Sequence, residues 1–158
     1  NEIGLCYINQ PQLLSTNVIY QGYVDDKIDL NTGYLSAQQL MLLFKSLPVD
    51  ITFVNENDEV CYFSETSDRI FPRSKAIIGR KVQNCHPPES VHVVNQIIDD
   101  FKSKQRSHAD FWIQIHARFV HIRYFALYDD AGVYQGTIEV SQDVTEIRTL
   151  TGEKRLLV

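Results

Sequence analysis

Cys85 and His86 are adjacent in the sequence, and their side chains are the pair best suited to chemistry. A neutral imidazole can ligate haem iron or zinc, and a neighbouring thiol can respond to redox state. His86 directly precedes Pro87 and Pro88, at the start of an expected helix. The alternative is that His86 caps or packs against the helix entry. His86 is therefore a candidate axial ligand for haem, with a structural role as the alternative.

Other potential metal ligands are scattered. His116 and His121 flank an expected tight hairpin, and His92 lies in the helix after His86, so a transition-metal cluster is one hypothesis. Positions on opposite faces or in solvent are the competing interpretation, and we assign no metal site. The three cysteines are far apart and include no CxxC pair, which argues against a disulfide framework or structural zinc. A reducing, cytoplasmic compartment fits this pattern.

The sequence lacks the common catalytic motifs. It contains no GxSxG, no HExxH and no glycine-rich phosphate loop, and only 7 of its residues are glycine. We therefore expect no enzymatic active site. A metal-dependent or redox enzyme that uses Cys85 and His86 is kept as a third alternative.

Composition describes an ordinary globular chain. Its 158 residues are 44% hydrophobic and 22% charged, which predicts one domain with an appendage. The net charge of −5 comes without a basic stripe, so nucleic acid is not an expected partner. No apolar run approaches the roughly 20 residues of a membrane span, so no membrane association is expected. The sequence begins with Asn1, and a longer parent chain is one interpretation of that start.

The first 47 residues are expected to form a flanking segment. A short strand is predicted at 27–30, ending at Asn31-Thr32-Gly33. Ser36 offers an N-cap for a helix near 36–46, whose apolar residues recur three to four apart, and Pro48 closes it.

From residue 48 the pattern becomes that of strands. Strands at 51–54 and 60–63 flank a turn-forming cluster, which predicts a hairpin. Residues 64–86 favour short helices and loops. A long helix follows Pro87-Pro88, with apolar residues at helical spacing as far as Phe101. Three more strands are predicted at 110–116, 119–128 and 133–141, joined at 117–118 and 129–132.

This element order predicts an α+β fold, in which a five-stranded antiparallel sheet has its helices on one face. Within 119–128, apolar residues occupy both faces of the strand. Both faces therefore need cover, and the second is available to the N-terminal segment or to another copy of the chain.

Several motifs resemble the PAS family. The stretch 136–145, with Asp143-Val144-Thr145, resembles the end of a PAS domain, and 47–55 followed by Tyr62-Phe63-Ser64 resembles its first hairpin. Ile78-Gly79-Arg80 occupies the expected place before the long helix. The resemblance sets a PAS domain at 48–150, with a tail at 151–158.

The strings 78–88 and 152–157 are similar to a bacterial PAS subfamily of unassigned function. Its members often share a chain with haemerythrin-like domains, which makes such a domain a candidate partner in the full-length chain. The resemblance implies a ligand pocket between the helices and the inner sheet face, dimerisation through flanking elements, and signal passage through the segment after Thr145.

The candidate residues are chosen by the side of the helix or strand on which each of them lies. A filled core without ligand is the alternative for the pocket, and cover by the helix at 36–47 is the alternative for the interface. The ligand-binding candidates are Cys85, His86, Val91, Val94, Ile98, Phe101, Ile113, Ile122, Tyr124 and Ile138. The interface candidates are Trp112, Arg123 and Phe125.

Flavin is not an expected cofactor. PAS photosensors carry a reactive cysteine within Gly-Arg-Asn-Cys, whereas here Lys81 follows Gly79-Arg80 and Cys85 comes four positions later. The leading hypothesis is a sensory or regulatory domain that binds a small apolar or haem-like ligand and signals through homodimer packing. The alternative is a ligand-free module for dimerisation or docking.

Overall fold

The computed structural model describes residues 23–24 and 27–156. The chain divides into two compact units, 1–39 and 40–158. The first unit contains a small antiparallel sheet, β1 (Tyr23–Val24), β2 (Lys27–Asp29) and β3 (Tyr34–Ser36). The strand predicted at 27–30 is β2, and the turn after it places Asn31 at φ 65°. Cys6 and the rest of 1–22 lie outside the described residues.

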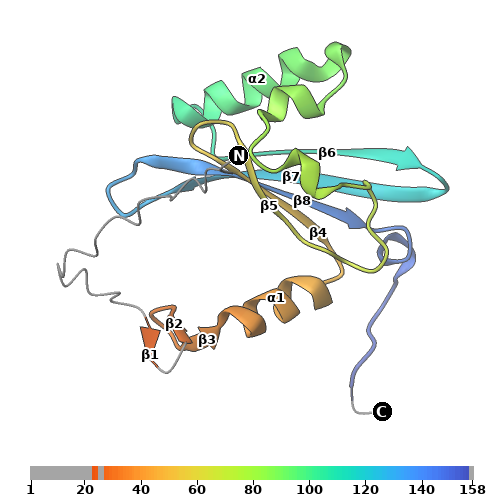
Figure 1. Cartoon of the computed structure of the whole chain (residues 1–158). Coiled ribbons are helices and arrows are strands. Elements are labelled where there is room, and N and C mark those ends of the chain that lie inside the picture. The colour runs from red at the N-terminus through yellow and green to blue at the C-terminus, as the bar shows by residue number, and fades with distance from the viewer. Residues whose placement is uncertain (1–22, 25–26, 157–158) are drawn as a thin grey trace, which may run out of the picture. The chain divides into compact units, whose positions relative to one another are not determined.

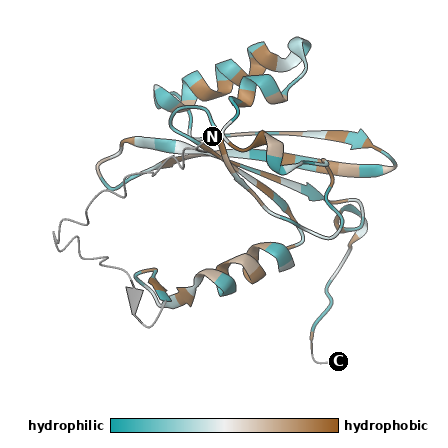
Figure 2. Cartoon of the chain, viewed as in Figure 1, coloured by the Kyte–Doolittle hydropathy of each residue, from teal (hydrophilic) through white to brown (hydrophobic). Residues whose placement is uncertain are grey.

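Helix α1 (Ala37–Ser46) begins in the first unit and ends in the second. The Ser36 hydroxyl accepts the backbone N–H of Gln39, while the Gln39 side chain accepts that of Ser36. This reciprocal capping box explains the start of the helix and confirms the predicted position. Apolar residues follow one another along α1 (Figure 2), and none of its side chains is buried.

The second unit is built on a five-stranded antiparallel sheet in the order β5-β4-β8-β7-β6. Its strands are β4 (Asp50–Asn55), β5 (Val60–Phe63), β6 (His108–Ile115), β7 (Arg118–Tyr128) and β8 (Tyr134–Asp143). Three short 3₁₀ turns are Lys75–Ile77, Val82–Cys85 and Ile147–Thr149. Helix α2 (Pro88–Lys102) lies over one face of the sheet, here called the inner face (Figure 1). The predicted α+β architecture is confirmed.

The sequence explains how α2 forms and docks. Pro88 occupies the first turn together with Glu89, and Lys102 lies in the last, which suits the helix dipole at both ends. Ile98 and Phe101 are buried against the sheet, and Phe101 is 0% exposed. The Tyr128 hydroxyl donates to the Phe101 carbonyl oxygen at 2.6 Å, so β7 also holds the end of the helix.

The turn between β6 and β7 differs by one residue from the prediction at 117–118. It consists of His116 and Ala117, which have φ angles of 47° and 63°. Two consecutive positive φ angles suit the right-handed twist of a two-residue hairpin. The metal-cluster hypothesis requires His116 and His121 to face each other across this hairpin. Strand pairing instead places Trp112 opposite His121, so the two histidines do not face each other.

The inner face of β4 and β8 is polar. Its buried side chains are Asp50, Thr52, Thr137, Glu139 and Ser141. Val54 is a buried apolar residue on this face, whereas Ile51, Phe53, Ile138 and Val140 point to the opposite, outer face. The prediction that Ile138 lines the pocket is therefore wrong, because Ile138 pairs with Phe53 and Phe125 on that outer face.

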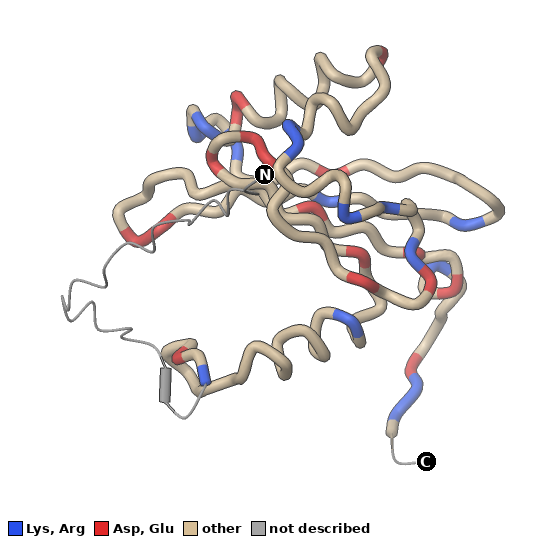
Figure 3. Tube along the Cα trace, in the orientation of Figure 1, with Lys and Arg blue, Asp and Glu red and all other residues tan. Residues whose placement is uncertain are grey.

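Charges of both signs are interspersed along the described chain (Figure 3). Within the ranges that the structure describes, no helix is long and apolar enough to cross a membrane.

Candidate functional site

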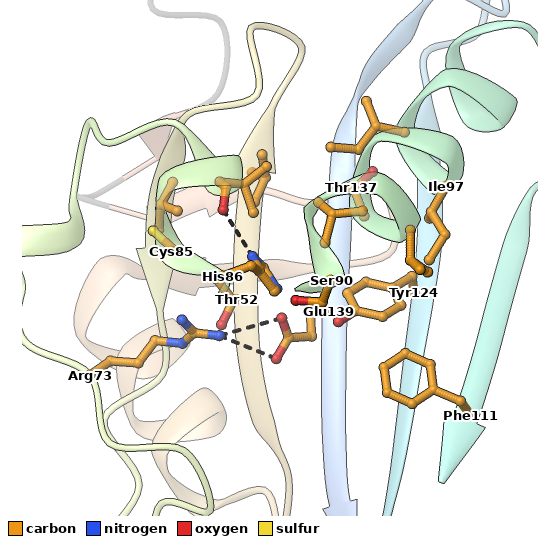
Figure 4. Close-up of a pocket in the computed structure, with 16 residues that line it drawn as sticks. Thr52, Arg73, Cys85, His86, Ser90, Ile97, Phe111, Tyr124, Thr137 and Glu139 are labelled. Atoms are coloured by element: carbon orange, nitrogen blue, oxygen red, sulfur yellow. Dashed lines mark hydrogen bonds and ion pairs between the residues drawn. The ribbon is translucent and has the colours of Figure 1, made fainter. Parts of the chain in front are cut away.

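A cavity of about 110 Å³ lies between α2 and the inner face of the sheet. Most of its wall is apolar, and a few polar side chains gather at one end (Figure 4). The apolar lining is Val54, Val60, Val82, Val93, Val94, Ile97, Ile98 and Phe111. The other lining residues are Thr52, Arg73, Cys85, His86, Ser90, Tyr124, Thr137 and Glu139.

Half of the predicted ligand-binding residues line this cavity: Cys85, His86, Val94, Ile98 and Tyr124. The other half do not. Phe101 and Ile122 are fully packed in the core, Ile113 is paired with Val120 beyond the cavity, and Val91 lies outside the lining set.

His86 is oriented by the turn that precedes it. Its Nδ1 lies 2.9 Å from the Val82 carbonyl oxygen, which requires a proton on Nδ1 and leaves Nε2 as an acceptor in the neutral ring. The Cys85 thiol is directed at the Lys81 carbonyl oxygen, 3.7 Å away. Both contacts are to backbone of the same short turn, so they stabilise that turn as well as shaping the cavity wall.

Arg73 and Glu139 form the charged end of the cavity (Figure 4). One guanidinium nitrogen, Nη2, lies 3.4 Å from each Glu139 carboxylate oxygen. Charge-assisted N–H···O bonds are usually about 2.7–2.9 Å long, so this pair is loose. The buried Nε of Arg73 has no hydrogen-bond partner among the described residues. Arg73 also lines a shallow groove on the surface beside β5, so it separates the cavity from that groove.

A second arginine completes the polar layer under β4. Arg69 donates to the carbonyl oxygens of Phe71 and Ser64 and to the Thr52 hydroxyl. Its guanidinium lies 3.8 Å from the Asp50 carboxylate, and burial lowers the pKa of Arg69. Every guanidinium nitrogen of Arg69 is thus bonded, unlike those of Arg73.

Tyr124 contributes an aromatic ring and a hydroxyl to the same end. Its ring stacks on Phe111 with centroids 5.8 Å apart. Burial, with the Glu139 carboxylate nearby, raises the pKa of Tyr124 far above its usual value. The hydroxyl therefore stays protonated and available as a donor. No hydrogen bond joins it to another side chain or backbone group within the described ranges.

Haem and flavin are too large for this cavity. Drug-sized ligands occupy cavities of roughly 300–1,000 Å³, and the 110 Å³ here is far below that range. The free Nε2 of His86 has suitable chemistry for an axial ligand, but the walls leave no space for a macrocycle. Among the residues described, no three His, Cys, Asp or Glu side chains come together as a metal site.

Trp112, Arg123 and Phe125 share the outer face of the sheet, as strand pairing shows. The Trp112 side chain is 62% exposed and that of Phe125 is 38% exposed. Arg123 donates to the Gln142 side chain at 3.2 Å. The structure therefore brings the three interface candidates together on one accessible surface.

Sequence reasoning missed the polar end of the cavity. Thr137 and Glu139 alternate with apolar neighbours along β8. The period-two pattern therefore offered two possible inward faces, and the apolar face with Ile138 was chosen as the one that lines the pocket. Arg73 lies in the aperiodic stretch 64–86, where neither helix nor strand spacing predicts which side chain turns inward.

Comparison with known proteins agrees with this architecture. The family model of a PAS domain matches residues 40–145. The chain is similar to the C-terminal domain of a protein from Streptococcus mutans, with 32% sequence identity and a TM-score of 0.75 over 79% of this chain and 97% of that one. A PAS domain from Colwellia psychrerythraea is 15% identical with a TM-score of 0.51, covering 69% and 97%. None of the curated proteins matches the sequence.

Proposed function

The chain belongs to the PAS domain family, and we propose that it is a sensory or regulatory module that binds a small, largely apolar molecule in the cavity under α2. PAS domains are typical of sensory and signalling proteins. The observation that carries the proposal is the cavity itself, since a core filled only for stability leaves few voids larger than a water molecule. An apolar cavity of about 150 Å³ can bind benzene, so a space of 110 Å³ suits a ligand of about one small ring.

Binding would be read out through subunit packing. The exposed apolar residues of α1 and of the outer face support a homodimer, and a ligand that favours one packing arrangement over another shifts the equilibrium between them. The output would come from another domain of a longer cytoplasmic protein, of which the haemerythrin-like domain is the one suggested by the subfamily resemblance.

The second candidate function is a ligand-free interaction module. The exposure of Trp112 favours it, because an interface anchor is useful whether or not the cavity is filled. Catalysis by Cys85 and His86 has no comparable support, since both side chains are directed at backbone carbonyl groups.

The decisive experiment is NMR titration of the labelled protein with five probes built on one benzene ring: toluene, acetophenone, benzamide, benzoate and benzylamine. We expect at least one probe to shift the signals of cavity residues, and Val94→Phe to abolish the effect by filling the space. Val91→Phe is the matched control, since Val91 lies on the same helix outside the lining. If none of the five probes shifts the signals of cavity residues, the ligand-binding function is rejected in favour of the interaction module.

A further inference from the structure

Three side chains at the polar end of the cavity leave hydrogen-bonding capacity unused. The Arg73 Nε–H has no acceptor among the described residues, but protein atoms enclose it, so a ligand in the cavity does not reach it. The Tyr124 hydroxyl is a protonated donor that reaches the cavity. Glu139 receives only long contacts, at 3.4 Å from Arg73 and 3.3 Å from the Ser141 hydroxyl. A ligand that accepts from the Tyr124 hydroxyl and donates to Glu139 gains affinity at this end of the cavity.

The charges around this end are balanced. Asp50 is paired with Arg69, and Glu139 is paired with Arg73. A ligand with a carboxylate would place a second negative charge beside Glu139, and an ammonium group would place a third cation beside the two arginines. Either would bury an uncompensated charge, which is unfavourable. The site therefore selects an uncharged molecule.

The arrangement of donors and acceptor is complementary to an amide. The Tyr124 hydroxyl and the Glu139 carboxylate present a donor and an acceptor next to each other, and Arg73 lies on the other side of the carboxylate (Figure 4). A carbonyl oxygen can accept from the Tyr124 hydroxyl, while the adjacent N–H donates to Glu139. Apolar walls from Val94, Ile97 and their neighbours leave space for a compact hydrocarbon body.

We propose that the ligand is a small, uncharged amide or lactam with a compact apolar body, held at its polar group by Glu139 and Tyr124. This inference rests on the proposed ligand-binding function and specifies the chemical class that the cavity prefers. Neither the imidazole of His86 nor the thiol of Cys85 takes part in it.

The same five ring probes test it, because they differ mainly in one substituent. Benzamide should bind about 5- to 10-fold more tightly than toluene, the difference expected of one or two net hydrogen bonds. Acetophenone, which keeps the carbonyl group but lacks the N–H, should fall between the two. Benzoate and benzylamine should bind more weakly than benzamide.

Substitution of tyrosine residues tests whether the Tyr124 hydroxyl contacts the amide group of the probe. Tyr124→Phe removes one hydroxyl and should weaken benzamide binding about fivefold while leaving toluene affinity unchanged. Tyr134→Phe is the control, because the Tyr134 hydroxyl is bonded to Thr137 and Tyr134 does not line the cavity. Toluene binding as tightly as benzamide, or benzoate binding most tightly, would overturn the inference while the ligand-binding function stands. Failure of every probe would overturn both.

Discussion

At the residue scale, Arg69 is the side chain on which the polar inner layer depends most. It connects the stretch after β5 to β4 by bonds to Ser64 and Thr52, and it offsets the charge of Asp50, which is only 4% exposed. Arg69→Met would leave that carboxylate without its cation, although the Thr66 hydroxyl and the Ile70 N–H still donate to it. We expect a loss of about 3 kcal/mol in the free energy of unfolding, measured by urea denaturation.

The control for this substitution is Arg118→Met. Arg118 bonds to Asp68 and lies near Asp143, but all three side chains are substantially exposed. Exposed ion pairs contribute roughly 0–1 kcal/mol, so the control should change stability little. Equal losses in the two variants would show that burial of the Arg69 network does not matter.

Asp143 provides a prediction about pH. Its carboxylate accepts the hydroxyl and the backbone N–H of Thr145, and these bonds lower the pKa of Asp143 from its ordinary value of 3.8. A lowered folded-state pKa stabilises the protein above the unfolded value, and the contribution is lost as pH falls through the folded pKa. Thr145→Val should therefore raise the pKa of Asp143 toward 3.8, measured by carboxyl NMR titration.

Thr149→Val is the matched control, since the Thr149 hydroxyl donates to the Glu146 carbonyl group instead. An unchanged titration of Asp143 in Thr145→Val would mean that the hydroxyl is not the main cause of the shift.

The residues of the candidate site could be predicted from the sequence only in part. Val94 and Ile98 follow helical periodicity, so their inward direction was predictable. On β8 the polar residues face inward and Ile138 outward, contrary to the usual rule. That reversal depends on Arg69 and Arg73, which a loop without periodicity brings beneath the sheet, so it is a tertiary effect that a local pattern does not contain.

At the element scale, β8 has a position near its start, Gly136, that only glycine can occupy. Gly136 has φ +142°, and a Cβ there would lie 2.2 Å from the Val54 carbonyl oxygen and 2.8 Å from the Phe53 ring. Gly136→Ala must therefore move β8 away from β4, a central pairing of the sheet. We expect a loss of about 3 kcal/mol in unfolding free energy, measured by urea denaturation.

Gly79→Ala separates the effect of backbone strain at positive φ from the effect of a steric clash of the added Cβ. Gly79 also has a positive φ, of +78°, but no atom lies within 4 Å of the added Cβ. Backbone strain alone should cost about 1–2 kcal/mol there. A larger loss at Gly79 than at Gly136 would contradict the steric explanation.

Most element positions were predictable because local chemistry sets them. Ser36 and Gln39 cap α1, and Pro88 begins α2, each by contacts within a few residues. The β6–β7 turn was misplaced by one residue because His116 and Ala117 adopt positive φ without the glycine or asparagine that usually predicts it.

At the scale of the whole molecule, the ββ-helix-βββ order was enough to predict the fold, because few sheet topologies accommodate it. The outer face was predicted to need cover, and Trp112 remains 62% exposed to solvent in the structure. Helix α1 adds exposed apolar side chains at Met41, Leu42 and Leu43. Exposed apolar side chains of this kind are the basis of the homodimer proposed above.

The dimer proposal can be tested by light scattering after gel filtration at micromolar concentration. We expect the mass of two chains, and Trp112→Glu should yield the mass of one, because it removes the exposed indole ring and places a carboxylate that must lose its water in the interface. Val133→Glu is the control: Val133 is 57% exposed but lies in the β7–β8 loop, away from the outer face, so the dimer should persist. A monomeric parent protein would reject signalling through dimer packing. Ligand binding would be unaffected by that result, since the cavity lies on the inner face of a single chain.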